Sequence, residues 1–115
     1  MQISIIGLGR MGANMARRWA RGGVKVVAFD QSPEARANAI EANISAVASL
    51  AEAVTAQASP RVVWLMLPSG EITESTIDAL LPMLAKGDLL VDGGNANYKD
   101  TQRRAVKANA VGIEY

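Results

Sequence analysis

Short apolar segments rich in β-branched residues alternate along this chain with longer segments of helical periodicity. A strand, a crossover helix and a second strand form a parallel pair, so the alternation predicts a parallel sheet with helices on both faces. Residues 61–67 (RVVWLML) are apolar at nearly every position, as in a central strand buried on both sides. The expected strands are 2–6, 24–29, 44–48, 61–67 and 89–92, with another starting at 112–115. The expected helices are 10–21, 33–42, 50–57, 71–84 and 98–109, and Pro82 should end or kink the fourth near Leu81.

Composition narrows the possible functions. The 115 residues are enough for one compact domain, and a net charge of +1 with 4% aromatic residues gives no sign of a nucleic-acid surface. The chain has no cysteine and no histidine, so we expect no disulfide, no metal site and no histidine base. No segment has the roughly 18 apolar residues of a membrane span, and the amino-terminal segment lacks the features of a secretory signal. We therefore expect a cytoplasmic protein that contacts neither membrane nor nucleic acid.

A glycine-rich turn follows the first expected strand and opens the first expected helix. Its sequence fits G-x-G-x-x-G, which in this context is the fingerprint of a dinucleotide site. Gly7 permits the tight turn, Gly9 lets the backbone approach a pyrophosphate, and Gly12 lets the helix pack close to the strand. The helix N-terminus offers unpaired N–H groups to the phosphates. We therefore predict a Rossmann-like, doubly wound α/β fold over residues 1–115, with cofactor contacts from Gly7, Leu8, Gly9, Arg10, Met11 and Gly12.

An acidic residue ends the second expected strand. A carboxylate at Asp30 can accept hydrogen bonds from the ribose hydroxyls of NAD and would repel the 2′-phosphate of NADP. No arginine follows directly, since the next residues are Gln31 and Ser32. We therefore predict NAD as the preferred cofactor. Arg36, one turn into the next helix, is interpreted as a solvated residue, with contact to a 2′-phosphate as the alternative.

Two later strand ends should face the same crevice, because ligands of open parallel sheets collect at the carboxyl ends of the strands. One end comprises Leu67, Pro68 and Ser69, which we expect to line the ribose and nicotinamide part of the cofactor. The other is Asp92-Gly93-Gly94-Asn95, where the amide of Asn95 can both donate and accept hydrogen bonds.

Three stretches carry a family resemblance: GLGRMGANMA at 7–16, MLPSGEIT at 66–73 and VDGGNANYKDTQRR at 91–104. Together they resemble the N-terminal domain of the decarboxylating 6-phosphogluconate dehydrogenases, within the β-hydroxyacid dehydrogenase superfamily. The resemblance covers essentially the whole chain. The Gly-Gly-Asn turn with the following Asp-Thr-x-Arg-Arg is its most specific part.

The resemblance implies oxidation of 6-phosphogluconate at C3 with a nicotinamide cofactor, followed by decarboxylation to ribulose 5-phosphate. Asn95 would contact both the substrate and the nicotinamide end, while Arg103 and Arg104 would support the last helix. NADP-dependent members tend to carry Asn-Arg-Thr after the second strand, and this chain has Asp30-Gln31-Ser32 there.

The family's catalytic lysine and glutamate, its Ser-Gly-Gly turn and its all-helical dimerisation domain would all lie beyond Tyr115. We therefore expect no catalytic residue within 1–115, a truncated cofactor domain, and a full-length homo-oligomer. Lys86, Lys99 and Lys107 are interpreted as solvated lysines. Two alternatives stay open: another β-hydroxyacid dehydrogenase, similar to 3-hydroxyisobutyrate dehydrogenase, or a non-catalytic nucleotide-binding module.

Overall fold

A computed structural model describes residues 2–68, 70–94 and 98–115. The strands run over β1 (Gln2–Ile6), β2 (Lys25–Phe29), β3 (Ser45–Val47), β4 (Val62–Leu65) and β5 (Leu89–Asp92). The α-helices are α1 (Arg10–Arg21), α2 (Pro33–Glu41), α3 (Leu50–Thr55), α4 (Glu71–Leu80) and α5 (Tyr98–Asn109). Strands and helices alternate throughout, as the sequence predicts.

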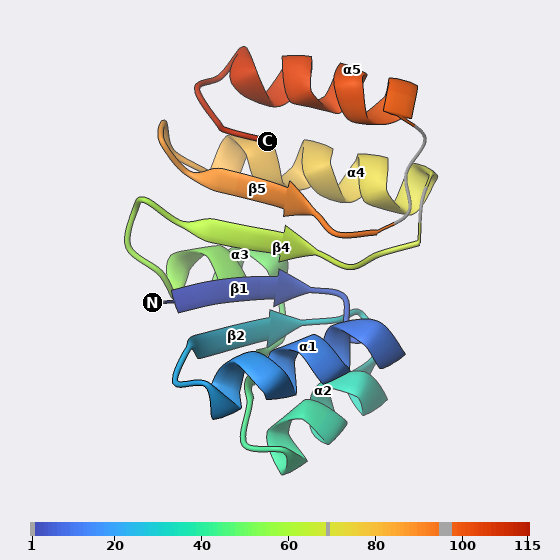
Figure 1. Ribbon diagram of the computed structural model, residues 1–115, viewed down its shortest axis with the longest axis vertical. Coiled ribbons are helices and arrows are strands. Elements are labelled where there is room, and N and C mark those ends of the chain that lie inside the picture. Colours follow the sequence, from blue (N-terminus) through green and yellow to red (C-terminus); the bar gives the residue numbers. More distant parts are fainter. Residues whose placement is uncertain (1, 69, 95–97) are drawn as a thin grey trace.

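All paired strands are parallel, and the order across the sheet is β3-β2-β1-β4-β5. The central strand β1 therefore separates one half built from β2 and β3 from another built from β4 and β5. Helices α1 and α2 cover one face, and α3 and α4 cover the other (Figure 1). The predicted doubly wound fold is confirmed, and the carboxyl ends of the strands meet along one edge.

Two apolar clusters, one on each face, hold these layers together. Ile5 and Ala28 pack with Ala16 of α1 on one face, whereas Leu65 and Leu90 pack with Ile77 of α4 on the other. Consecutive strand residues point to opposite faces, so β1 can supply Ile5 to one cluster and Ile6 to the other. None of the described helices is long and apolar enough to cross a bilayer.

Local signals in the sequence set several helix ends. Ser32 caps α2 by accepting a hydrogen bond from the backbone N–H of Ala35 at 3.2 Å, and Pro33 occupies the first helical position. Helix α4 ends at Leu80, and a short 3-10 helix follows at Leu81–Met83, where Pro82 prevents an α-helical hydrogen bond. The predicted end near Leu81 is confirmed.

Residues 112–115 form less structure than predicted. Glu114 makes a single parallel bridge to Leu89, with Leu90 N donating to Glu114 O at 2.8 Å and Glu114 N donating to Asp88 O at 3.0 Å. The segment lies beside β5 in the sense of a sixth parallel strand, but it does not extend into a full ladder.

Asp88 stabilises the edge of the sheet at which the strands begin, opposite the edge formed by their carboxyl ends. Its side chain is fully buried and accepts hydrogen bonds from Ser59 Oγ (2.7 Å), Arg61 N (2.6 Å), Arg61 Nη1 (3.1 Å) and Ala85 N (2.8 Å). Burial by itself would raise the pKa of Asp88, but these donors outweigh it and lower the pKa to about 2. The carboxylate therefore joins the turn before β5 to the segment that enters β4.

Asp88 gives a testable pH dependence. Because its folded-state pKa lies below the unfolded value, its stabilisation is complete above about pH 4 and is lost as pH falls towards 2, a loss on the order of 2 kcal/mol. We expect Asp88→Asn to lower the free energy of unfolding at pH 7, with the deficit shrinking as pH approaches 2. Urea unfolding at several pH values measures the deficit at pH 7 and its change with pH. The control is Glu41→Gln, at an exposed acid on α2, and a deficit for Asp88→Asn that stayed constant with pH would contradict this role.

Candidate functional site

A crevice lies where the two halves of the sheet diverge, at the carboxyl ends of β1 and β4. Gly7 N donates to Phe29 O at 2.9 Å and so follows β2, while Met66 N donates to Ile6 O at 2.8 Å and so follows β1. The cavity there measures about 560 Å³. It is lined by Gly9, Arg10, Met11, Gly12, Met66, Leu67, Pro68, Gly93 and Gly94. This is the switch point at which open α/β sheets bind ligands.

The three glycines of the turn have different structural requirements. Gly7 has φ +105°, and any side chain there would overlap the carbonyl of Met66. A side chain at Gly12 would overlap the carbonyl of Gly7. A Cβ at Gly9, by contrast, would have no described protein atom within 4 Å. The fold explains Gly7 and Gly12, whereas Gly9 faces open space at the mouth of α1.

The first turn of α1 is suited to an anion. Gly9 is the N-cap residue of α1 and has no side chain to bond the first N–H groups of the helix, and residues 10–13 include no acid. The backbone N–H groups of such a turn and the positive end of the helix dipole are available to a phosphate. Arg10 and Met11 are exposed beside them.

Asp30 lies directly after β2, as predicted, and both of its carboxylate oxygens already accept backbone hydrogen bonds. Leu8 N donates to Oδ2 at 2.7 Å, and Ser32 N donates to Oδ1 at 2.8 Å. Each oxygen keeps further acceptor capacity. Asp30 therefore ties the glycine turn to the β2–α2 connection, a structural role that the sequence does not reveal.

Arg36 is not the solvated residue that the sequence suggested. It is half-buried, and its Nη1 donates to the carbonyl oxygens of Asp30 at 2.8 Å and Gln31 at 3.3 Å. The guanidinium therefore braces the segment that carries Asp30, because a helical arginine five and six residues further on can reach back over the turn.

A second hollow of about 100 Å³ opens beside the crevice, between the ends of β1 and β2 and the start of α4. Gly7, Asp30 and Leu67 contribute to it, so it adjoins the glycine turn. Sequence reasoning missed its other walls, which are Ile6, Phe29, Gln31, Leu50, Ile72 and Thr76. Ile72 is 51% exposed despite being apolar. An amphipathic pattern alone cannot single out such a residue.

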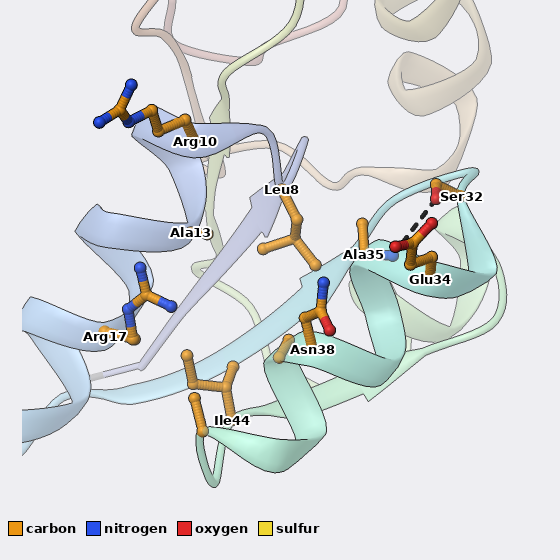
Figure 2. A pocket seen from close by; sticks show the side chains of 11 residues that line it. Leu8, Arg10, Ala13, Arg17, Ser32, Glu34, Ala35, Asn38 and Ile44 are labelled. Carbon is orange, nitrogen blue, oxygen red and sulfur yellow. Dashed lines mark hydrogen bonds between the residues drawn. The ribbon is translucent and has the colours of Figure 1, made fainter.

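A third hollow, of about 340 Å³, lies between α1 and α2. Leu8, Asn38 and Ile44 point into it, while Arg10 turns away from its floor (Figure 2). Its lining includes Glu34 in the first turn of α2, so an acid stands there, whereas the first turn of α1 at the crevice has none and suits a phosphate better.

Trp64 lies beneath the other wall of the crevice. A side chain at Gly93 would overlap its indole, and its Nε1 is buried without a hydrogen-bond partner among the described residues. Trp19 packs against it edge to face, with ring centroids 5.3 Å apart. Trp64 therefore contacts the β5 side of the crevice directly, through Gly93, and Trp19 contacts it through Trp64. Of the predicted site residues, Leu67 and Pro68 line this crevice, and Ser69 and Asn95 lie outside the described residues.

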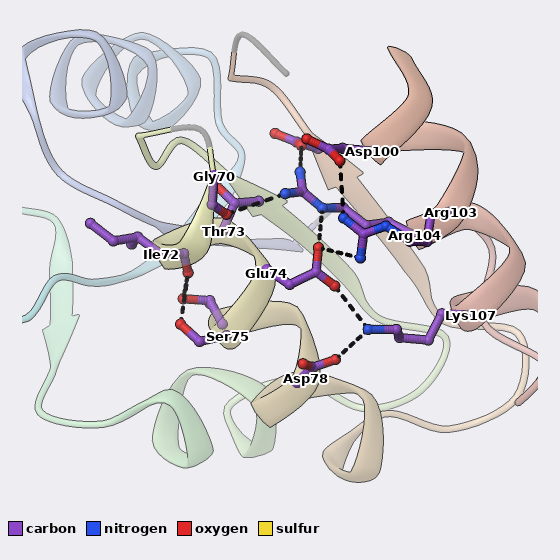
Figure 3. Close-up of polar contacts among 12 residues, drawn as sticks. Gly70, Ile72, Thr73, Glu74, Ser75, Asp78, Asp100, Arg103, Arg104 and Lys107 are labelled. Atoms are coloured by element: carbon purple, nitrogen blue, oxygen red, sulfur yellow. Dashed lines mark hydrogen bonds and ion pairs between the residues drawn. The ribbon is translucent and has the colours of Figure 1, made fainter. Parts of the chain in front are cut away.

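The Asp-Thr-x-Arg-Arg stretch forms a charge cluster at the start of α4 (Figure 3). Glu74 accepts from Lys107 Nζ (2.8 Å), Arg104 Nε (2.9 Å) and Arg103 Nη1 (2.9 Å). Lys107 and Arg104, followed by Arg103, outweigh the effect of burial and lower the pKa of Glu74 to about 2. Lys107 also pairs with Asp78 at 2.8 Å, and with its side chain 38% exposed it is a surface lysine that has two carboxylate partners.

Comparison with known proteins identifies the family. The family described as "NAD binding domain of 6-phosphogluconate dehydrogenase" matches residues 2–115. An NAD(+)-dependent decarboxylating 6-phosphogluconate dehydrogenase of Haloferax volcanii is 40% identical over 114 residues, covering 99% of this chain and 38% of that protein. The chain thus spans well under half the length of this relative.

Two solved structures agree with this match. A Mycobacterium tuberculosis 3-hydroxyisobutyrate dehydrogenase has a TM-score of 0.89 at 30% identity, over 98% of this chain and 38% of its own. A Plasmodium falciparum 6-phosphogluconate dehydrogenase has a TM-score of 0.89 at 27% identity, over all of this chain and 26% of its own. With a parallel sheet, a glycine turn at its switch point and a family match over 2–115, this chain belongs to the NAD-binding domain family of the 6-phosphogluconate dehydrogenases.

Proposed function

We propose that this chain binds NAD in the crevice, as the cofactor domain of an enzyme that oxidises and decarboxylates 6-phosphogluconate to ribulose 5-phosphate. Gly9 is the observation that carries the proposal. It stands between two glycines that the fold requires, yet the described protein atoms leave room for a side chain there. A pyrophosphate that approaches the backbone at the mouth of α1 explains why this position is also glycine.

In this proposal the cofactor crosses the ends of the strands. The pyrophosphate lies at Gly7, Leu8, Gly9, Arg10, Met11 and Gly12, and the adenosine ribose lies at Asp30. The adenine occupies the second hollow, where Phe29 and Ile72 offer apolar walls. The nicotinamide end lies between Leu67-Pro68-Ser69 and the Gly93-Gly94-Asn95 turn, with Asn95 also contacting the substrate. The bound cofactor would accept the hydride from the substrate.

NAD rather than NADP is supported by the residues after β2. The carboxylate of Asp30 would repel a 2′-phosphate, and the Nη1 group of Arg36 already serves two backbone carbonyls. The relatives differ in this respect. The Haloferax protein is named NAD(+)-dependent, whereas the Plasmodium enzyme is described in complex with NADP+ as its cofactor.

The Mycobacterium neighbour keeps a second candidate open, because a 3-hydroxyisobutyrate dehydrogenase shares this fold equally well by TM-score. The Gly93-Gly94-Asn95 turn favours the 6-phosphogluconate branch. A substrate panel on a full-length protein, with 6-phosphogluconate and small 3-hydroxy acids, distinguishes the two. We also propose that a full-length protein would form a homo-oligomer through a helical domain beyond residue 115. The oligomeric state of that full-length protein tests this proposal.

The glycine turn allows a matched test. We expect Gly9→Ala to weaken NAD binding by about tenfold or more, because its methyl group would occupy the path of the pyrophosphate, while changing stability by less than about 1 kcal/mol. Gly12→Ala should instead destabilise the fold by about 1–3 kcal/mol, because its methyl group meets the carbonyl of Gly7. Calorimetric titration and urea unfolding measure these effects. Unchanged NAD affinity in Gly9→Ala would remove the main support for the site.

The charge of Asp30 can be separated from its structural role. Asp30→Asn keeps a side-chain oxygen for one of the two backbone N–H groups and removes the negative charge, so affinity for NADP should rise about tenfold while that for NAD falls. Glu34→Gln is the control, since it removes a nearby exposed charge in the first turn of α2. Titrations with NAD and NADP give the ratio of the two affinities for each variant. If Asp30→Asn had the same ratio as Glu34→Gln, Asp30 would be ruled out as the discriminating group.

The 115-residue chain should bind NAD without oxidising 6-phosphogluconate. The described walls of the crevice are glycines, Arg10, Met11, Met66, Leu67 and Pro68, and none of these takes up a proton from a hydroxyl near pH 7. The assay follows NADH absorbance in the presence of substrate, with binding confirmed separately by quenching of tryptophan fluorescence. Turnover by this chain would overturn the assignment of catalysis to residues beyond 115.

A further inference from the structure

The side chain of Arg104 is 1% exposed, although it carries a permanent charge. From α5, its guanidinium reaches three acceptors at two points, the start of α4 and the end of β5. Nε donates to Glu74 Oε1 at 2.9 Å, Nη2 donates to Gly70 O at 3.2 Å, and Nη1 faces Asp92 Oδ2 at 3.5 Å. A buried charge is tolerated only when it is paired and hydrogen-bonded, and the planar fork of arginine can serve several acceptors at once.

The first of these points is the start of α4, just after the turn that follows β4. Gly70 O accepts hydrogen bonds from both Arg104 Nη2 and Glu74 N, the latter at 3.0 Å. In the same turn of the helix, Thr73 Oγ1 donates to Pro68 O at 2.7 Å. Arg104 therefore holds the start of α4, to which Thr73 binds Pro68, a residue of the crevice wall.

The second point is the end of β5. The side chain of Asp92 is 8% exposed. Its Oδ1 accepts from Gly94 N at 3.0 Å, while its Oδ2 faces Arg104 and accepts from Tyr115 OH at 3.3 Å. Gly94 packs so closely on the first turn that an added Cβ would lie 2.9 Å from Leu67 O. The turn after β4 and the turn after β5 are thus in contact at the crevice. The guanidinium of Arg104 contacts Gly70 O next to the first turn and Asp92 next to the second.

We propose that Arg104 is a positioning residue for this site: it fixes the turn after β4 and the turn after β5 relative to each other, and so shapes the nicotinamide side of the crevice. The inference rests on the proposed binding of NAD. Arg104 does not line the crevice, and its effect is transmitted through Gly70 O and Asp92.

The other side of the crevice does not depend on Arg104. The glycine turn is held by Asp30, whose partners are Leu8 N and Ser32 N. Helix α4 itself stays on the sheet through Ile77 and Leu80, both fully buried in the apolar cluster. Loss of Arg104 should therefore loosen the turns at Pro68 and Gly94 while leaving the adenosine and pyrophosphate contacts in place.

The chain offers a matched control in the neighbouring residue. Arg103 also pairs with Glu74 at 2.9 Å, but its side chain is 53% exposed and it pairs in addition with Asp100, which belongs to neither turn. Arg103→Lys and Arg104→Lys are the same chemical change on adjacent residues. Lysine keeps the charge but cannot serve three acceptors in a plane.

The experiment titrates both variants and the parent chain with NAD and with ADP, which lacks the nicotinamide half. We expect Arg104→Lys to weaken NAD by about tenfold or more and ADP by no more than about threefold, because only the loosened turns face the nicotinamide. Arg103→Lys should keep both affinities within about twofold, the usual small effect of an exposed ion pair. If Arg104→Lys fails to fold, Asp92→Asn takes its place as the test. It keeps an oxygen for Gly94 N and should show the same selective loss of NAD affinity.

Amide hydrogen exchange without ligand supplies a second readout. Exchange at Gly94 N and Glu74 N should speed up in Arg104→Lys, while Leu8 N and Ser32 N stay as in the parent. Parent-like NAD affinity in Arg104→Lys and Asp92→Asn, or equal losses for NAD and ADP, would overturn the role of Arg104 and leave the proposed function standing. A parent chain that bound neither ligand would overturn the proposed function and this inference together.

Discussion

The close contact between the end of β1 and the end of β4 is the constraint on which the rest of the structure depends. Gly7 passes so near the carbonyl of Met66 that no side chain fits between them. At this point one half of the sheet continues through β2 and the other through β4, and α1 has to begin immediately afterwards. The crevice exists because the chain leaves β1 through this narrow gap and exposes the N-terminus of α1 at the point where the two halves diverge.

Apolar packing and polar contacts have separate tasks in this domain. The two apolar clusters hold the helices against the sheet, but they do not specify the conformation of the turns at its edges. Buried charges do that at both edges, with Asp88 between β4 and β5 on the amino side and Arg104 on the carboxyl side. In both places one side chain joins segments far apart in sequence, and its desolvation is offset by several hydrogen bonds.

The sequence allows the fold to be predicted because strand and helix periodicities are local properties, and the glycine turn with Asp30 identifies the edge where a ligand would bind. The roles of Arg36, Arg104 and Lys107 could not be predicted. Their spacing is that of ordinary charged helix positions, and only the tertiary structure places Arg104 beside its acceptor Gly70, 34 residues away in sequence. The additional walls at Ile72 and Thr76 come from α4, and the crossover from β4 to β5, not any local pattern, brings them beside the ends of β1 and β2.

Under the proposed function, Asp30 would link cofactor choice to the integrity of the turn that precedes α1. The carboxylate that would discriminate against a 2′-phosphate also receives the backbone N–H groups of Leu8 and Ser32. A lineage changing its cofactor through this position would lose part of its loop structure in the same step. An exchange to a small apolar residue is therefore a poor first step, and a neutral residue with a side-chain oxygen is the accessible intermediate. With Asp30 in the proposed role, a pair of backbone hydrogen bonds would confine the evolution of cofactor preference to a narrow sequence path.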